Sequence, residues 1–164
     1  MDALDPNETL KLDNQLCFVL YALSRKITGL YRPLLDELGV TYPQYLVMLV
    51  LWEAFPSTTD LPVAQPLEAS GEAGVPIKYL CEKLLLDTGT LTPLLKRLEA
   101  SGLVARTRSA KDERAVLISL TEKGNGLKQK ARTIPVEVLC NSKLPIQTLG
   151  PLQKELRDLL FQME

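Results

Sequence analysis

The sequence predicts a mainly α-helical protein with one small β-hairpin, which is an α+β fold. Two patterns predict this class. Apolar residues recur at steps of three and four along most of the 164-residue chain, as they do in amphipathic helices. After about residue 102 the pattern changes: two runs of strand-forming residues, LVARTRS and RAVLISL, flank the polar turn AKDE, which is typical of a hairpin.

The first predicted element is a long amphipathic helix over residues 12–38. Asp13 is a candidate cap near its start, and Gly39 closes it. Its apolar positions are Leu16, Leu20, Leu23, Ile27, Leu30, Leu34 and Leu38. A second helix opens at Thr41, has Pro43 near its first turn and is expected to end at Trp52 or Ala54.

Residues 55–75 are predicted to form a Pro-rich insertion or loop. The run PSTTDLPVAQPLEASGEAGVP has four prolines and two glycines, contains no Lys or Arg and shows no helical period. A loop of this length is unusual inside a compact domain, so it is either a surface insertion or a functional arm.

Two closely spaced helices follow, and then the hairpin. The first helix is IKYLCEKLLL, residues 77–86, and the second begins at Asp87 or Thr88 and stops at Gly102. Pro93 is tolerated in this second helix if it lies in about the first turn. After the hairpin, Thr121 is expected to start a helix that reaches about Cys140. A last amphipathic helix has Leu149, Leu152, Leu156, Leu159, Leu160 and Met163 on its apolar side.

A helix pair followed by a hairpin is the arrangement of a winged helix-turn-helix, whose second helix enters the major groove of DNA. We therefore expect residues 1–164 to form a single subunit with its DNA-binding lobe at 76–120.

Basic residues gather in this predicted lobe although the net charge of the chain is only −1. The same stretch contains the acids Glu99, Asp112 and Glu113, so its local net charge is positive. The alternative to a DNA-binding surface is an ordinary charged surface in contact with solvent. The cations are Lys96, Arg97, Arg106, Arg108, Lys111 and Arg114. We expect Asp112 to aim the guanidinium of Arg114 into a minor groove. Candidate DNA contacts at the start of the second helix are Thr88, Gly89, Thr90 and Thr92.

Composition excludes several classes of function. The chain has no histidine, which removes imidazole bases and His-containing zinc sites. Three widely spaced cysteines, Cys17, Cys81 and Cys140, form neither a CxxC pair nor a disulfide framework. No apolar run is long enough to span a bilayer. We expect a cytoplasmic protein with no metal and no cofactor.

Two runs carry a resemblance to a known family. LDTGTLTPLLKRLEASGLVARTRSAKDERAVLISLTEKG resembles the winged helix of the MarR superfamily. LDNQLCFVLYALSRK resembles one branch of it, the organic hydroperoxide resistance regulators. The resemblance implies a homodimer whose dimerisation helices lie within 12–38 and 121–164. It also implies a repressor that binds palindromic operator DNA and releases it when an organic hydroperoxide oxidises an N-terminal cysteine. Cys17 is that cysteine by motif match, and Tyr31 and Tyr42 match the two tyrosines that hydrogen-bond it.

Spacing constrains how this cysteine and its tyrosines meet. Fourteen residues separate Cys17 from Tyr31, which is about 21 Å along a straight helix. Contact therefore requires the same helix of a second subunit, related by a two-fold axis. Tyr21, one turn beyond Cys17, can line the same pocket.

The fate of the oxidised cysteine has two alternatives. The resemblance implies that Cys140 is the resolving thiol that forms a disulfide with the sensing cysteine of the partner subunit. If Cys140 is instead a buried apolar residue, a low-molecular-weight thiol would cap Cys17. Nothing in the sequence indicates a role for Cys81 other than packing in its helix.

Three other functions compete with a redox-controlled repressor. One is a repressor of the same superfamily released by a small phenolic ligand. Another is a thiol-dependent peroxidase. This sequence has no arginine next to the cysteine motif to hold a peroxide, and a peroxidase would not explain the wing. We therefore expect no enzyme. The third is a helical dimer that does not bind DNA.

Overall fold

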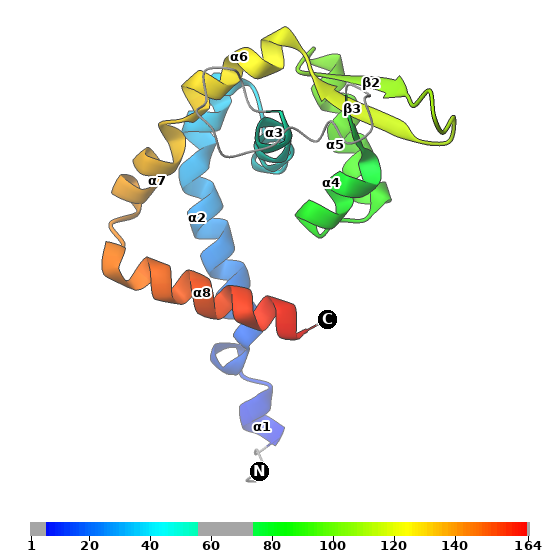
Figure 1. Cartoon of the computed structure of the whole chain (residues 1–164). Helices are drawn as coiled ribbons and strands as arrows, with labels where there is room; N and C mark the ends of the chain where they lie inside the picture. Colours follow the sequence, from blue (N-terminus) through cyan, green and yellow to red (C-terminus); the bar gives the residue numbers. More distant parts are fainter. Residues whose placement is uncertain (1–5, 56–73, 164) are drawn as a thin grey trace. The chain divides into compact units, whose positions relative to one another are not determined.

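The computed structural model describes residues 6–55 and 74–163, so most of the predicted Pro-rich insertion lies outside the described residues. The chain divides into two compact units. We call residues 32–132 the winged-helix unit, and the described parts of residues 1–31 and 133–164 the terminal unit. The helices and strands are α1 (Pro6–Thr9), a 3₁₀ turn (Leu12–Asn14), α2 (Leu16–Leu38), α3 (Tyr42–Ala54), β1 (Val75–Pro76), α4 (Ile77–Leu84), α5 (Thr88–Ala100), β2 (Val104–Arg108), β3 (Val116–Leu120), α6 (Glu122–Ala131), α7 (Ile134–Ser142) and α8 (Ile146–Gln162) (Figure 1).

The long helix α2 starts at Leu16, the first residue of its apolar pattern, and not at residue 12 as predicted. Its first turn is closed by Gln15, whose carbonyl accepts from the N–H groups of Phe18 and Val19. Asp13 lies in the preceding 3₁₀ turn, so its predicted role as a helix cap is wrong. Gly39 ends the helix with a positive φ of 69°, as predicted. No helix of the described residues is long and apolar enough to cross a membrane.

The core of the winged-helix unit is built around α3. Tyr45, Met48 and Leu51 of this helix are almost fully buried, and α3 contacts α4, α5, α6 and β3. Helix α5 buries Leu91, Leu95 and Leu98, whose spacing of four and three places them on one face. This apolar face packs α5 against the core, and the opposite face of α5 stays exposed.

A three-stranded antiparallel sheet of order β1-β3-β2 completes the unit. β2 and β3 form the predicted hairpin, with Val104 opposite Leu120 and Arg108 opposite Val116. In Figure 1 these two strands run side by side and their turn projects away from the helices. The strand β1 was not predicted; Val75 pairs with Ile118, and Pro76, which lacks an N–H, is tolerated because β1 is an edge strand.

Helix α6 is anchored inside the winged-helix unit. Thr121 caps it by accepting from the N–H of Gly124 at 3.0 Å, as the sequence predicts. The carbonyl of Gly124 accepts from the indole N–H of Trp52 at 3.1 Å. The ammonium of Lys128 donates to the carbonyl of Trp52 at 3.2 Å, and burial lowers the pKa of this lysine. These bonds fix α6 to the end of α3.

The single helix predicted from Thr121 to about Cys140 is wrong. α6 ends at Ala131 and α7 begins at Ile134. Pro135 is the second residue of α7, and an uninterrupted helix would lose the hydrogen bond from its N–H and bring its ring against the carbonyl of Ala131. The break therefore falls immediately before this proline.

The terminal unit buries little of its apolar surface. Ile134 and Val138 of α7 are the buried apolar residues among its described side chains. All exposed large apolar residues of the described chain except Leu49 and Leu85 belong to this unit. They are Leu10, Leu12, Leu16, Phe18, Val19, Leu20, Tyr21, Val136, Leu144, Leu152, Leu159, Leu160, Phe161 and Met163. Exposed apolar surface on this scale is typical of an interaction face.

Candidate DNA-binding surface and thiol sites

The turn between α4 and α5 is short and tightly bonded. Leu85 ends α4 in the left-handed region with φ of 53°, and Asp87 caps α5. The carboxylate of Asp87 accepts from the hydroxyl of Thr90 at 2.7 Å and from its backbone N–H at 2.8 Å. These two bonds lower the pKa of the Asp87 carboxyl. The turn thus holds the start of α5 in one conformation.

Two threonines of α5, Thr90 and Thr92, present oxygen lone pairs rather than free O–H groups. Thr90 donates its hydroxyl to Asp87, and Thr92 donates to the carbonyl of Thr88 at 2.7 Å. The hydroxyl of Thr88 lies 3.7 Å from the sulfur of Cys81. Thr88, Gly89 and Thr90 are exposed, and Thr92 is half-buried. In this conformation Thr90 and Thr92 can accept from base amino groups but cannot donate to phosphates.

The predicted DNA-contacting cations separate into two groups. Lys96 and Arg97 on α5, Arg108 on β2 and Arg114 beyond the hairpin turn are exposed. Arg106 is different: its guanidinium lies 3.8 Å from the carboxylate of Glu99, and only 22% of its side chain is exposed. Its Nε is buried and has no partner among the described residues.

The turn of the hairpin is organised by a residue that the sequence analysis missed. Ser109 is buried, and its hydroxyl accepts from the backbone N–H groups of Lys111 and Asp112, both at 3.1 Å. A serine followed by a polar turn is the available signal for this motif.

The role predicted for Asp112 needs correction. Its carboxylate accepts from the backbone N–H of Arg114 at 3.0 Å, not from the guanidinium. A short aspartate side chain reaches the backbone two residues ahead more readily than it reaches a long side chain. The guanidinium of Arg114 has no acceptor among the described residues and extends into solvent.

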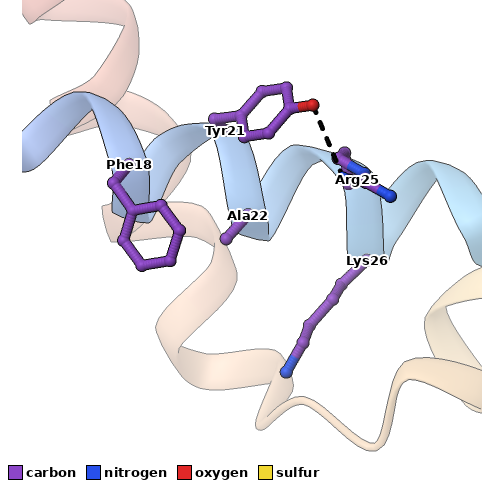
Figure 2. A pocket seen from close by; sticks show the side chains of 5 residues that line it. All are labelled: Phe18, Tyr21, Ala22, Arg25 and Lys26. Atoms are coloured by element: carbon purple, nitrogen blue, oxygen red, sulfur yellow. Dashed lines mark hydrogen bonds between the residues drawn. The ribbon is translucent and has the colours of Figure 1, made fainter. Parts of the chain in front are cut away.

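The first thiol lies on the terminal unit. Cys17 is the second residue of α2 and is exposed. Tyr21, one turn further along, accepts from the guanidinium of Arg25 at 3.5 Å, and that guanidinium also stacks 5.5 Å from the centre of the Tyr21 ring. A hollow of about 350 Å³ on this part of α2 is lined by Phe18, Tyr21, Ala22, Arg25 and Lys26 (Figure 2).

The two remaining predicted tyrosines are placed differently. Tyr31 is half-buried in α2, and burial raises the pKa of its phenol. This phenol therefore keeps its proton at neutral pH and remains a hydrogen-bond donor. α2 is unbroken between Cys17 and Tyr31, so these residues do not meet within one chain. Tyr42 is the first residue of α3 and is half-buried.

The other two thiols differ in accessibility. Cys140 on α7 is exposed and does not pack in the core of this chain. Cys81 on α4 is half-buried beside Thr88. Among the described residues no three Cys, Asp or Glu side chains are grouped as metal ligands.

This geometry can be compared with known proteins. A sequence profile described as transcriptional regulator SarA/Rot matches residues 29–131. The chain belongs to this family of transcriptional regulators. A relative from Bacillus subtilis (strain 168), named organic hydroperoxide resistance transcriptional regulator, is 49% identical over 92% of this chain and 90% of its own length. The predicted MarR-type resemblance and its organic hydroperoxide branch are confirmed.

Solved structures of the family match nearly the whole chain. Reduced AbfR bound to DNA, from Staphylococcus epidermidis, has a TM-score of 0.69 and 33% identity and covers 97% of this chain and 99% of its own. Disulfide-formed AbfR has a TM-score of 0.57 and 35% identity over 94% of this chain and 96% of its own. These relatives are regulators rather than enzymes, and the chain is a DNA-binding transcriptional regulator whose relatives respond to cysteine oxidation.

Proposed function

We propose that the chain is a homodimeric cytoplasmic repressor that releases a palindromic operator when an organic hydroperoxide oxidises Cys17. The observation that carries this proposal is the exposed thiol of Cys17 in the first turn of α2. Two findings from relatives support it: one relative has been solved both reduced on DNA and in a disulfide form, and another is named for organic hydroperoxide resistance.

The DNA-binding role rests on the exposed side of α5 and on the wing. Thr88, Gly89, Thr90 and Thr92 lie at the N-terminal end of α5, where backbone N–H groups favour phosphates and hydroxyl oxygens can read base edges. Lys96, Arg97 and Arg108 supply exposed positive charge for the phosphate backbone. Arg114, on the tip that Ser109 and Asp112 order, is assigned to the minor groove.

The dimer follows from surface that one chain leaves uncovered. The apolar side chains at the start of α2 and along α8 are exposed in the single chain. A second copy would bury them, and a two-fold dimer explains why the operator should be palindromic. It also supplies the phenols, because Tyr31 lies about 21 Å along α2 from Cys17 of the same chain. We assign Tyr31 and Tyr42 of the partner subunit as donors to the thiolate, with Tyr21 beside it.

The proposed chemistry is a two-electron oxidation of the thiolate. The sulfur of Cys17 attacks the terminal oxygen of the hydroperoxide, an S–O bond forms and the O–O bond breaks. The alkoxide takes a proton and leaves as an alcohol, so the peroxide is reduced and the thiol becomes a sulfenic acid. That acid condenses with Cys140 of the partner subunit, or with a low-molecular-weight thiol, and releases water. Phe18 and Leu20 favour an organic oxidant over hydrogen peroxide.

Operator binding before and after oxidation tests this function. The reduced parent should retard a palindromic promoter fragment, and cumene hydroperoxide should abolish the shift. Cys17→Ser should bind the fragment and stay bound in peroxide, whereas the control Cys81→Ser should behave as the parent does. Release of Cys17→Ser by peroxide at the parent's dose would refute the proposal.

The resolving thiol is tested separately on non-reducing gels. Peroxide should convert the parent to a disulfide-linked dimer, and Cys140→Ser should remain monomeric under denaturing conditions. A monomeric parent band that carries a small-thiol adduct at Cys17 would assign resolution to the low-molecular-weight thiol instead.

A further inference from the structure

One hydroxyl at the start of α5 has its polarity set by a neighbouring side chain. One oxygen of the Asp87 carboxylate accepts from the hydroxyl of Thr90 at 2.7 Å, and the other accepts from the backbone N–H of Thr90 at 2.8 Å. These bonds hold the pKa of Asp87 below its ordinary value, so the group is ionised at neutral pH and has no proton to give. Thr90 is therefore the donor in the bond between the two side chains.

The backbone beside Asp87 leaves room for this arrangement. A Cβ at Gly89 would lie 2.9 Å from Oδ1 of Asp87, so a larger residue at position 89 would press on the carboxylate. The carboxylate thus keeps the one proton of the Thr90 hydroxyl. What Thr90 presents to an approaching ligand is an oxygen with lone pairs only.

Thr90 also lies on a side of α5 that faces solvent. Arg97 follows it by seven residues, which is almost two turns, so these two exposed side chains share one side of the helix. With α5 in the major groove, the Thr90 hydroxyl is placed for base edges, and the longer Arg97 reaches toward the phosphates.

Base edges in the major groove differ in the polarity that such an oxygen needs. Adenine and cytosine each present an amino group there, whereas guanine and thymine present only hydrogen-bond acceptors. An oxygen that has only lone pairs bonds the first two bases and repels the other two. Each base pair holds one amino group in this groove, so the oxygen distinguishes which strand carries it.

We propose that Thr90 reads one amino-bearing base, adenine or cytosine, in each half-site of the operator, and that Asp87 imposes this choice by holding the threonine proton. Thr90 is then a specificity-determining residue, and Asp87 a positioning residue that acts through it. This inference rests on the proposed function, because that function assigns α5 to the operator. It does not depend on the oxidation of Cys17.

Affinity for symmetrically substituted operators tests the proposal. The probe is the palindromic promoter fragment, in which each base pair of a half-site is changed in turn to the other three pairs, together with its symmetry mate. Dissociation constants of the reduced protein are measured by fluorescence anisotropy. The parent should have one position where adenine and cytosine are both preferred over guanine and thymine by about fivefold per half-site, as expected for one neutral hydrogen bond.

Two variants of Thr90 connect this position to its hydroxyl. Thr90→Val keeps the branched shape without the hydroxyl, and it should bring the preference at this position close to one. Thr90→Ser keeps a hydroxyl that can donate to Asp87, and it should retain the preference. Because serine lacks the methyl group, retention excludes an apolar contact of that methyl as the source of the preference.

Asp87→Asn isolates the polarity of the hydroxyl. Asparagine is an equally good helix cap, because its Oδ1 still accepts from the backbone N–H of Thr90. Its amide nitrogen then donates to the Thr90 hydroxyl and frees the threonine proton for the groove. The preference for adenine and cytosine should fall to one or below at this position alone, since Thr92 gives its proton to a backbone carbonyl. The lost negative charge changes affinity for all fragments alike, so it cancels in the ratio.

The outcomes separate this inference from the proposed function. A specificity profile that Thr90→Val leaves unchanged would overturn the inference, and so would an Asp87→Asn variant that keeps the parent's preference at the position that depends on Thr90. The operator-binding repressor would stand in both cases. Failure of the reduced parent to bind any of the fragments would overturn the proposed function and this inference together.

Discussion

Substitution of two glycines in α6 should have opposite effects on stability. A Cβ at Gly124 would lie 2.0 Å from the carbonyl oxygen of Leu103 and 2.9 Å from its carbonyl carbon. To restore a contact of 3.4 Å, backbone would have to move by about 1.4 Å on one side or the other. Gly126, half a turn further along α6, has no heavy atom within 4 Å of the same position.

The magnitudes follow from these surroundings. Overpacking a well-packed site costs about 1–3 kcal/mol, and Gly124→Ala should lie at the upper end because the clashing atoms are backbone. It should also strain the bond from the Trp52 indole to the Gly124 carbonyl. Gly126→Ala should instead stabilise the protein by up to about 1 kcal/mol, because alanine is the better helix former.

Urea unfolding measures both effects through the single tryptophan of the chain. Trp52 fluorescence and far-UV circular dichroism should give the same midpoint, at equal protein concentration for all variants because the protein is proposed to be a dimer. Operator affinity should fall only in Gly124→Ala. Equal midpoints for the two alanine variants would show that the docking of α6 against Leu103 is wrong.

Two other predictions concern the DNA-binding surface. Replacement of Arg108 by Gln should reduce the slope of log affinity against log salt by about 0.9 per lost phosphate contact, whereas Arg106→Gln should lower affinity with little change of slope, because its guanidinium is bound to Glu99; a slope change for Arg106→Gln as large as that for Arg108→Gln would place Arg106 on the phosphates. Because the folded pKa of Asp87 is lowered, its stabilising contribution is complete above the unfolded pKa of about 3.9 and disappears as pH falls through the folded pKa. Below about pH 4 the midpoint temperature of thermal unfolding should therefore fall more steeply with decreasing pH for the parent than for Asp87→Asn. Parallel curves of midpoint temperature against pH would contradict this assignment.

Local signals in the sequence predicted most of the winged-helix unit. Glycines at 39 and 102, with positive φ, end helices where the sequence placed their ends. Asp87 and Thr121 cap the helices that they were expected to start. These features depend on a few neighbouring residues, so a single sequence contains the information.

Features that depend on distant or competing partners were not predictable in the same way. The strand β1 exists because Val75 meets Ile118, 43 residues away in the chain. Whether Arg106 faces DNA or Glu99 depends on how β2 packs beside α5, and the sequence alone made it one of six equivalent cations. Pro135 did carry a local signal for the break between α6 and α7, and the single predicted helix did not take it into account.

The candidate thiol site shows a similar division. The motif around Cys17 gave its position near the start of a helix, and exposure of the sulfur is a property of the folded chain. Arg25 had no motif to mark it, because its contact with the ring of Tyr21 is a property of the folded chain. The tyrosine donors depend on a second subunit, and their assignment to Cys17 stays a proposal.

The most direct test of the redox switch follows operator release and cysteine chemistry in the same sample. The operator-bound protein is titrated with cumene hydroperoxide, and each step is divided between fluorescence anisotropy of labelled DNA and peptide mass spectrometry of the three cysteines. The account predicts that the fraction of DNA released equals the fraction of subunit pairs modified at Cys17, while Cys81 stays a free thiol. Release of the operator while Cys17 remains reduced would contradict it.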